Sequence, residues 1–365
     1  MTARRARWTA TLALTTSLIV AGPAQATPGR WDPLPPRPRW VNAPPPDVSA
    51  PSWILFDDQS DWVISSHDPD GRRAPASTTK VMTALVVAEH AAFDEMVTVS
   101  ATAPEAGESE IGIVEGERIS VADLLAAVLV RSANDAALAL AEHVGGSVEG
   151  FAALMNEKAR ELGMSNSHFL NPHGLDEEGH YTTAVDELKM AQALMANPQL
   201  ASMVALRRID FPAAPDGTLR GGHATNQLLD SYPGATGVKT GYTFQASLVL
   251  AAAAEREGRR LFAIVMGSEG TNGHFVDADA LLDYGFEEAR IPTTVSEIDL
   301  DGPLGTAARG ETLTWLALSG LLAPPPPPAS PTVVTVIRQA EDPPDWPEAL
   351  SWVETYWDWI VAGGS

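Results

Sequence analysis

The chain has 365 residues, of which 45% are hydrophobic and 19% charged, enough apolar material for one large domain or two smaller ones. Its formal net charge of −23 at pH 7 repels nucleic acid and anionic lipid headgroups, so neither is an expected partner. The absence of cysteine excludes a disulfide framework and a lipid anchor attached through cysteine.

The first 26 residues have the pattern of an export signal. Three arginines near the start precede a mostly apolar stretch from Trp8 to Ala21, and Ala24-Gln25-Ala26 offers a small-x-small cleavage site. The apolar stretch is too short, and too closely followed by Pro23, to favour a permanent membrane span. We therefore expect an exported protein.

A proline-rich segment, residues 27–51, separates this signal from the expected core. It holds nine prolines, a composition typical of a semi-rigid extended spacer. The core begins near Ser52, where two short apolar runs flank a polar turn at 57–61. This pattern predicts a hairpin of two strands.

Helices are predicted through the middle of the chain. A helix from about Ser77 to Ala91 is apolar on all sides and so belongs in the interior of a domain. Ser120 and Asp123 form a capping box that opens a second helix over 121–130. A turn at 132–134 interrupts it, and the helices expected after this turn run to His143 and over 150–162 and 183–196.

Strand signals return near the end of the predicted core. They lie at 237–243, 248–254 and 261–266, with 255–260 as the turn between the last two, and a closing helix spans about 275–289. Strands at both ends with helices between them predict an α+β architecture with a helical subdomain. The N- and C-terminal segments would share one antiparallel sheet flanked by helices.

The last part of the chain differs in character. Residues 291–323 give no clear prediction, 324–331 form a polyproline linker, and 332–365 form an acidic tail rich in tryptophan. The apolar stripes of the tail fit either packing against its own domain or peripheral contact with a membrane interface. Its acidic residues oppose contact with anionic lipid. Both interpretations stay open.

Three short patterns carry the strongest chemical signal: Ser77-Thr78-Thr79-Lys80, Ser132-Ala133-Asn134 and Lys239-Thr240-Gly241. The chain has four lysines, and two of them stand in these patterns. A desolvated lysine can lose its proton and act as a base, whereas arginine cannot. Alone, each pattern also fits a helix surface position or an interhelix turn. The three together, in order and well separated, favour a catalytic site.

The spacing of the first pattern suits a nucleophile and its base. Residues three apart share one face of a helix, so Lys80 can reach the hydroxyl of Ser77 and take its proton. A second cation about 4 Å away would lower the pKa of Lys80 by roughly three units, and Lys239 is the candidate.

The other two patterns suit substrate binding. The hydroxyl of Thr240 can bond a carboxylate, and Gly241 fits a strand that a ligand backbone approaches closely. Ser132 and Asn134, presented by a turn between helices, could relay a proton and hold a substrate amide.

With these motifs the chain resembles the D-alanyl-D-alanine carboxypeptidases, the low-mass penicillin-binding proteins of the serine β-lactamase-like superfamily. The likeness covers about residues 52–290 and also includes Ala74-Pro75-Ala76, Asn134-Asp135-Ala136-Ala137, Asn171-Pro172-His173-Gly174-Leu175 and Tyr242-Thr243. The resemblance implies a β-lactamase/transpeptidase-like fold, action at the cell-wall face outside the cytoplasm, and no metal or cofactor.

The resemblance also implies the chemistry. Ser77 would attack the carbonyl between the two terminal D-alanines of a peptidoglycan stem peptide, leaving an acyl-enzyme that water hydrolyses. Lys80 would be the base, Ser132 would pass a proton to the leaving amine, and Asn134 would hold Lys80 and the substrate amide. β-Lactams would acylate Ser77 as covalent inhibitors.

The remaining implied roles concern the substrate carboxylate and the oxyanion. Lys239 and Thr240 would bind the carboxylate, and the N–H groups of Ser77 and Tyr242 would form the oxyanion hole. His274 stands where family members often have an arginine that helps to bind this carboxylate. We expect His274 to make a weaker contact, charged below about pH 6.5; the alternative is a surface histidine in a turn.

Other functions remain open from the residues alone. The histidines at 168, 173 and 180 lie near acidic residues, but their spacing suits no standard zinc site. A class A-like β-lactamase would need a glutamate for deacylation, and no Glu-x-x-Leu-Asn segment follows Ser132. A DD-endopeptidase that cuts cross-links has the same motifs, and a non-catalytic wall-binding protein could share the fold.

Overall fold

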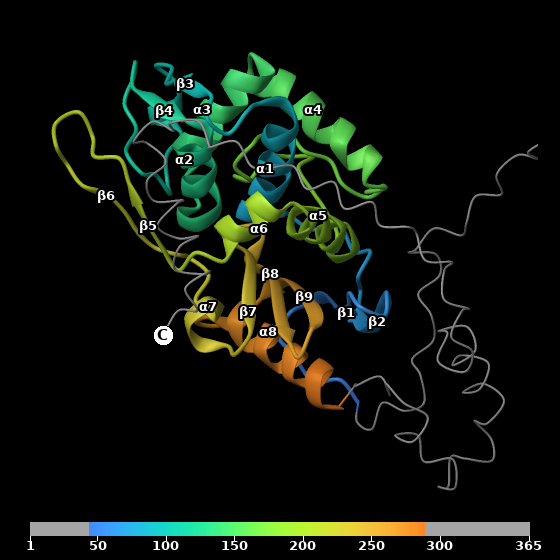
Figure 1. Cartoon of the computed structure of the whole chain (residues 1–365). Helices are drawn as coiled ribbons and strands as arrows, with labels where there is room; N and C mark the ends of the chain where they lie inside the picture. Colours follow the sequence, from blue (N-terminus) through green and yellow to red (C-terminus); the bar gives the residue numbers. More distant parts are fainter. Residues whose placement is uncertain (1–43, 289–365) are drawn as a thin grey trace, which may run out of the picture. The chain divides into compact units, whose positions relative to one another are not determined.

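The central feature of the structure is a five-stranded antiparallel sheet (Figure 1), in a computed structural model that describes residues 44–288. The strand order is β2-β1-β9-β8-β7. The strands are β1 (Ser52–Asp57), β2 (Trp62–His67), β7 (Ala235–Thr243), β8 (Ser247–Arg256) and β9 (Arg259–Ser268). The prediction that N- and C-terminal segments share one antiparallel sheet is therefore confirmed.

One predicted turn is wrong. Residues 255–260 were expected to form the turn between two strands, but Glu255 pairs with Arg260 and Arg256 with Arg259 inside the ladder. The turn itself is Glu257-Gly258, and both residues have positive φ, 52° and 76°. Charged residues were interpreted as a loop here, whereas they continue two strands beyond the buried part of the sheet.

Helices surround the sheet at positions close to those predicted. They are η1 (Ala76–Thr78), α1 (Thr79–His90), α2 (Val121–Ala126), the π-helical η3 (Ala127–Arg131), α3 (Asn134–Gly145), α4 (Val148–Glu161), α5 (Ala184–Ala196) and α8 (Gly273–Asp283), which continues as the π-helical η4 (Tyr284–Glu288). The sequence did not predict the short elements η2 (Ala103–Glu105), α6 (Pro198–Val204), α7 (Leu228–Ser231) and the hairpins β3 (Met96–Thr98)/β4 (Arg118–Ser120) and β5 (Arg208–Phe211)/β6 (Arg220–His223).

The second predicted helix begins as expected and ends differently. The hydroxyl of Ser120 accepts a hydrogen bond from the N–H of Asp123 at 3.1 Å, which is the expected N-cap. After Ala126 the α-helix widens into a π-helical turn, which ends at Ser132 in the left-handed conformation with φ 61°. A wide turn of this kind is often found at functional sites.

Both faces of the sheet are buried, which explains the continuous apolar runs in β8 and β9. Successive side chains of a strand point to opposite faces. One face packs with α1, α5 and α6 and includes Ile54, Val249, Ala251, Ile264 and Met266. The other packs under α8 and includes Trp53, Leu55, Leu250, Ala263 and Val265. Figure 1 shows α8 on the side of the sheet opposite to α5 and α6.

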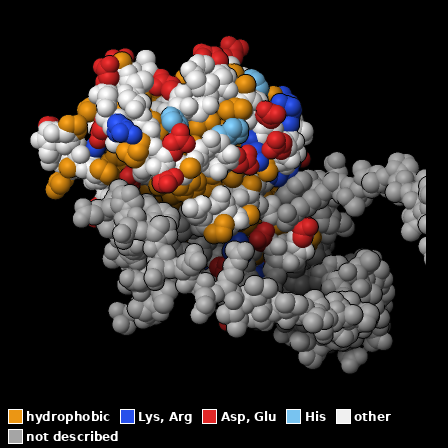
Figure 2. Space-filling view, turned by 45° about the horizontal axis from the view of Figure 1, so that its top comes forward, with side chains coloured by type: hydrophobic (Ala, Val, Ile, Leu, Met, Phe, Trp, Pro, Cys, Tyr) orange, Lys and Arg blue, Asp and Glu red, His pale blue; other side chains and the backbone are white. Residues whose placement is uncertain are grey.

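The surface reflects the acidic composition. Figure 2 shows carboxylate side chains spread over the helical face, with few basic ones between them. Within residues 44–288, no helix combines the length and apolarity needed to cross a bilayer.

Several predicted segments lie outside the described residues. These are the export signal (1–26), the first part of the proline-rich segment (27–43), and the segments 291–323, 324–331 and 332–365. Residues 44–51 are described and contain neither helix nor strand. Here Ser49 and Ala50 donate backbone hydrogen bonds to the carboxylate of Asp277 in α8, so the packed core begins slightly before Ser52.

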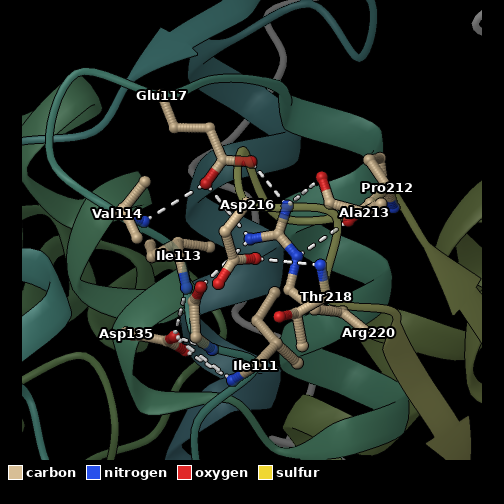
Figure 3. A network of polar contacts seen from close by, with 11 residues as sticks. Ile111, Ile113, Val114, Glu117, Asp135, Pro212, Ala213, Asp216, Thr218 and Arg220 are labelled. Atoms are coloured by element: carbon tan, nitrogen blue, oxygen red, sulfur yellow. Dashed lines mark hydrogen bonds and ion pairs between the residues drawn. The ribbon is translucent and has the colours of Figure 1, made fainter.

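A buried ion pair joins the β5–β6 hairpin to the helical subdomain (Figure 3). Both guanidinium Nη atoms of Arg220 donate to the carboxylate of Glu117, and Arg220 also donates to the carbonyls of Gly112, Pro212 and Ala213. The side chains of Arg220 and Glu117 are only 5% and 11% exposed. This contact therefore holds the hairpin against the loop that precedes β4.

We predict that Arg220→Met lowers the free energy of unfolding by about 3 kcal/mol, because it leaves the Glu117 carboxylate buried without its cation. Arg208→Met is the matched control, since Arg208 forms an exposed ion pair with Asp210 in the same hairpin. That change should stay within about 0.5 kcal/mol. Urea denaturation of both variants measures the difference, and equal stabilities would show that the buried pair does not hold the hairpin.

Candidate active site

Ser77 lies in a tightly packed turn at the start of α1. The preceding residue, Ala76, has a positive φ of 50°, an unusual conformation for a residue with a side chain. Two glycines press on this turn from opposite segments. A Cβ on Gly174 would lie 1.8 Å from the carbonyl oxygen of Ala76, and one on Gly241 would lie 2.9 Å from the nitrogen of Ser77. Only glycine fits at these two contacts.

Lys80 is fully buried and makes three hydrogen bonds. Its Nζ lies 2.9 Å from Ser77 Oγ, 2.6 Å from Asn134 Oδ1 and 2.8 Å from the carbonyl oxygen of His173. The last two partners can only accept. A neutral amine has two hydrogens for them, which leaves its lone pair directed at the hydroxyl of Ser77. The arrangement therefore suits a base that removes the proton of Ser77.

The environment of Lys80 favours this neutral form. Its pKa is lowered well below the usual value, chiefly by burial and then by the charge of Lys239; Glu108 and Asp135 act in the opposite direction. Lys239 was expected to lower the pKa of Lys80, but removal of Lys80 from water has the larger effect.

Lys239 lies beside Ser132 in the same site. Its Nζ donates to Ser132 Oγ at 3.0 Å and to the carbonyl of Thr240 at 2.8 Å. Burial lowers the pKa of Lys239 to about 7. Within residues 44–288, no salt bridge joins Lys239 to a carboxylate. A ligand anion would therefore meet a cation without a counterion.

Strand β7 forms the wall opposite α1. The hydroxyl of Thr240 donates to that of Thr225 at 2.8 Å, so its hydrogen is already engaged and would have to turn towards a bound carboxylate. Nothing in the sequence singled out Thr225. The glycine at 241 permits close approach of the chain's own turn at Ser77, in addition to any ligand. The side chain of Tyr242 is 63% exposed, so only its backbone can serve an oxyanion hole.

The loop before β4 positions Asn134. The Nδ2 of Asn134 donates to the carbonyl of Gly107, and its backbone N–H donates to that of Ser109. The next residue, Asp135, accepts hydrogen bonds from the N–H groups of Ile111, Gly112 and Ile113 (Figure 3). Its carboxylate thus fixes the same loop that orients Asn134. The sequence showed Asp135 as part of a pattern without a role.

The segment 171–180 forms the base of the site. Asn171 Oδ1 accepts from the N–H of Gly174, which shapes the turn that presents the His173 carbonyl to Lys80. The ring of His173 is partly buried near Lys80, and removal from water lowers its pKa to about 3. His180 accepts from the N–H of Leu170 at Nδ1 and so donates from Nε2 to Thr79. These histidines are neutral parts of the framework.

The prediction for His274 needs correction. His274 is buried in the first turn of α8, 6% exposed, and its ring packs against Phe275. Burial lowers its pKa to about 4, with Asp277 acting in the opposite direction, so the expected charge below pH 6.5 is wrong. The alternative of a surface histidine is wrong too. Among the described residues its Nδ1 has no hydrogen-bond partner, and the hydrogen bonds of Lys239 and Thr240 go to other groups.

Within the described part of the chain, no group of three or more His, Asp or Glu side chains is arranged to hold a metal ion. The structure thus brings together Ser77, Lys80, Ser132, Asn134, Lys239, Thr240 and Gly241, and places His274 apart from their hydrogen bonds.

A family model described as D-alanyl-D-alanine carboxypeptidase matches residues 40–270, well over half of the chain. The chain belongs to this family. The resemblance inferred from the three motifs is therefore confirmed.

Named relatives agree with this assignment. A D-alanyl-D-alanine carboxypeptidase of Bacillus subtilis is 34% identical over 244 residues, which are 66% of this chain and 62% of the relative. One from Mycobacterium tuberculosis is 36% identical over 252 residues, 67% of this chain and 85% of the relative. The chain thus spans less than two thirds of the Bacillus protein.

Solved structures of DD-peptidases confirm the fold. A D-alanyl-D-alanine carboxypeptidase of Mycobacterium tuberculosis, 34% identical, gives a TM-score of 0.66 over 71% of this chain and 97% of that one. The Streptomyces K15 DD-transpeptidase, 30% identical, gives 0.64 over 67% and 99%. The predicted β-lactamase/transpeptidase-like α+β fold is confirmed.

We predict that Gly174→Ala destabilises the protein by at least about 2 kcal/mol more than Gly179→Ala. Both glycines have positive φ, 87° and 92°, so the conformational strain of alanine is matched. The new Cβ would collide with the Ala76 carbonyl at 174, whereas at 179 its nearest neighbour is a leucine methyl 3.6 Å away. Urea denaturation of both variants tests this, and equal losses would mean that Gly174 does not clamp the turn of Ser77.

Proposed function

We propose that this protein is a serine-type D-Ala-D-Ala carboxypeptidase, which removes the terminal D-alanine from peptidoglycan stem peptides. The observation that carries the proposal is the buried Lys80, which has Ser77 within hydrogen-bond distance and two further partners that can only accept its hydrogens. The named relatives support the choice of substrate, since they are D-alanyl-D-alanine carboxypeptidases.

The first half-reaction follows from the hydrogen bonds at Ser77. Neutral Lys80 takes the proton of Ser77 as Oγ attacks the carbonyl carbon between the two D-alanines. The tetrahedral intermediate then breaks its C–N bond, and the departing amine gains a proton. Ser132 would deliver the proton of its hydroxyl and regain one from the Lys239 ammonium, which donates a hydrogen bond to it. Free D-alanine leaves, and the rest of the peptide stays esterified to Ser77.

Binding uses the cation that lacks a counterion. Charged Lys239 would attract the terminal carboxylate of the stem peptide, with Thr240 turning its hydroxyl from Thr225 to the same group. Asn134 would hold the substrate amide through its Nδ2 group, which now bonds Gly107. Tyr242 follows Gly241, on which an added Cβ would lie only 2.9 Å from the nitrogen of Ser77. The backbone N–H groups of Ser77 and Tyr242 would stabilise the oxyanion.

Deacylation completes the cycle when water attacks the ester. One proton of the water passes through Ser132 to the neutral Lys239, and Lys80 returns its proton to the Oγ of Ser77 as the ester bond breaks. The sequence has no Glu-x-x-Leu-Asn segment after Ser132, which disfavours the rapid deacylation of a class A-like β-lactamase. We therefore expect β-lactams to act as long-lived covalent inhibitors. A DD-endopeptidase would use the same residues on a cross-linked substrate.

The expected location rests on the sequence. An export signal in residues 1–26 would carry the protein to the peptidoglycan, in the periplasm or outside the cell. The tryptophan-rich tail at 332–365 would add peripheral membrane contact there if it does not pack on its own domain.

We predict that Lys80→Arg slows acylation of Ser77 by a fluorescent penicillin roughly 10³-fold. Arginine keeps its proton and cannot serve as the base. Lys158→Arg is the control, because Lys158 lies on α4 in ion pairs with Glu89 and Glu161. It should acylate at the parent rate. Equal rates for the parent and Lys80→Arg would exclude Lys80 as the base.

The full chain should release free D-alanine from diacetyl-Lys-D-Ala-D-Ala, and Ser77→Ala should abolish the release by removing the nucleophile. Enzymatic detection of D-alanine over time measures both. A folded parent protein that is acylated by penicillin but releases no D-alanine would overturn the carboxypeptidase proposal. Cleavage of cross-linked muropeptides would then indicate the endopeptidase.

A further inference from the structure

Glu187 lies directly behind the turn that carries Ser77, and the proposed reaction makes no use of it. Helix α5, beside α1 in Figure 1, holds this carboxyl at 1% exposure against Thr78, the neighbour of Ser77. Thr78 Oγ1 lies 2.6 Å from Glu187 Oε1 and 2.6 Å from the carbonyl oxygen of Pro75. The other carboxyl oxygen of Glu187, Oε2, has no hydrogen-bond partner among the described residues.

The number of hydrogens available decides the protonation state. A threonine hydroxyl carries one hydrogen, and the Pro75 carbonyl can only accept one. A single hydrogen cannot fill two contacts of 2.6 Å. With an ionised Glu187, the hydroxyl of Thr78 could donate to Glu187 or to Pro75, and the other contact would bring two oxygens together with no hydrogen between them. A protonated Glu187 resolves the conflict, because it donates to Thr78 and Thr78 donates to Pro75.

The surroundings also favour the neutral acid. Burial raises the pKa of Glu187 to about 8, the hydrogen bond from Thr78 opposes this, and the charge of Asp186 adds to it. On α5 itself Lys189 pairs with Asp186, and α6 has no titratable residue. The other elements packed against α5 are α1, β1, β8 and β9, and their titratable side chains have partners other than Glu187. On α1, Lys80 bonds Asn134, Glu89 pairs with Lys158, and His90 bonds a backbone carbonyl. On the strands, Asp57 pairs with Arg259, Glu255 with Arg260, and Arg256 with Asp283.

We propose that Glu187 is a protonated carboxylic acid that positions the turn of Ser77, and that loss of its proton slows acylation. Glu187 does not touch the substrate and acts through Thr78. Once ionised it can only accept, so the hydroxyl of Thr78 turns towards it and leaves Pro75. The Pro75 carbonyl then keeps only the N–H of Thr78 at 3.4 Å. Because the turn packs against Gly241, its loosening moves the Ser77 N–H that faces the oxyanion.

The protonation state can be measured without any enzyme assay. Glu187→Gln keeps the shape of the side chain and donates to Thr78 at every pH, but it cannot ionise. The infrared difference spectrum of parent minus variant should show the carbonyl band of a protonated carboxylic acid at pH 6, and the band should vanish as pH rises past about 8. A carboxylate signal at pH 6 in place of that band would overturn the proposal, whether or not the protein is a carboxypeptidase.

The effect on Ser77 is measured by the acylation rate with a fluorescent penicillin between pH 6 and 9.5. Lys80 and Lys239 titrate in every variant, so the ratio of parent to Glu187→Gln isolates Glu187. If the ionised form does not acylate, this ratio should fall about tenfold between pH 7 and pH 9. Glu187→Met removes the carboxyl and leaves Thr78 bonded to Pro75, so the ratio of parent to this variant should fall with pH in the same way. This variant replaces Glu187→Gln if that one fails to fold.

The control is Asp123→Asn, which removes another carboxyl whose pKa burial raises, far along the chain from the turn. Its ratio to the parent should stay constant with pH. A parent-to-variant ratio that stays constant with pH for both Glu187 variants would refute a positioning role for Glu187. A ratio for Asp123→Asn that falls as much as theirs would show that the pH effect is not specific to Glu187.

Discussion

Lys80 is fully buried, and within residues 44–288 no salt bridge pairs it with a carboxylate; this is the constraint on which the rest of the site depends. An ammonium group removed from water costs several kcal/mol unless it is paired, so the neutral amine is favoured. Its three hydrogen-bond partners come from segments far apart in the sequence: the turn at Ser77, the start of α3 at Asn134, and the loop at His173. The fold has to hold these three segments together around one nitrogen atom.

Two glycines and an acid make that convergence possible. The turn of Ser77 is held between Gly174 on one side and Gly241 of β7 on the other, at distances that no Cβ could occupy. Next to Asn134, the carboxylate of Asp135 accepts hydrogen bonds from three successive backbone N–H groups of the loop that orients Asn134. The reactive atoms are thus placed mainly by backbone contacts. Backbone is stiffer than long side chains, and it suits a site that must align a nucleophile, a base and an oxyanion hole.

The sequence predicted the motif residues and the sheet well for a physical reason. Serine, lysine and glycine at fixed spacings need only local geometry, and the burial of β8 and β9 on both faces shows in their continuous apolar runs. Features that depend on distant partners could not be predicted in this way. Thr225 meets Thr240 only after β7 is in place, and the pair of Arg220 with Glu117 joins residues about a hundred positions apart. The charge of His274 was predicted wrongly because the burial of its ring in the first turn of α8 is a tertiary property.

The titrations of Lys239 and Glu187 change the stability of the folded protein in opposite directions as pH rises. Lys239 has a lowered pKa of about 7, so the unfolded chain binds more protons between pH 7 and 10.5, and stability from this group rises with pH over that range. Glu187 has a raised pKa of about 8, so the folded chain binds more protons between pH 4.5 and 8, and stability from this group falls with pH there. Near neutral pH the folded protein therefore bears most of the loss of stability that comes from charging the buried Lys239 and most of the loss that comes from the buried carboxyl of Glu187. A charged Lys239 that can meet an anion and a neutral Glu187 that can donate to Thr78 coexist from about pH 7 downwards. The structure therefore gives up stability at the pH where its site is correctly protonated, which is the trade expected of a functional site rather than of a structural core.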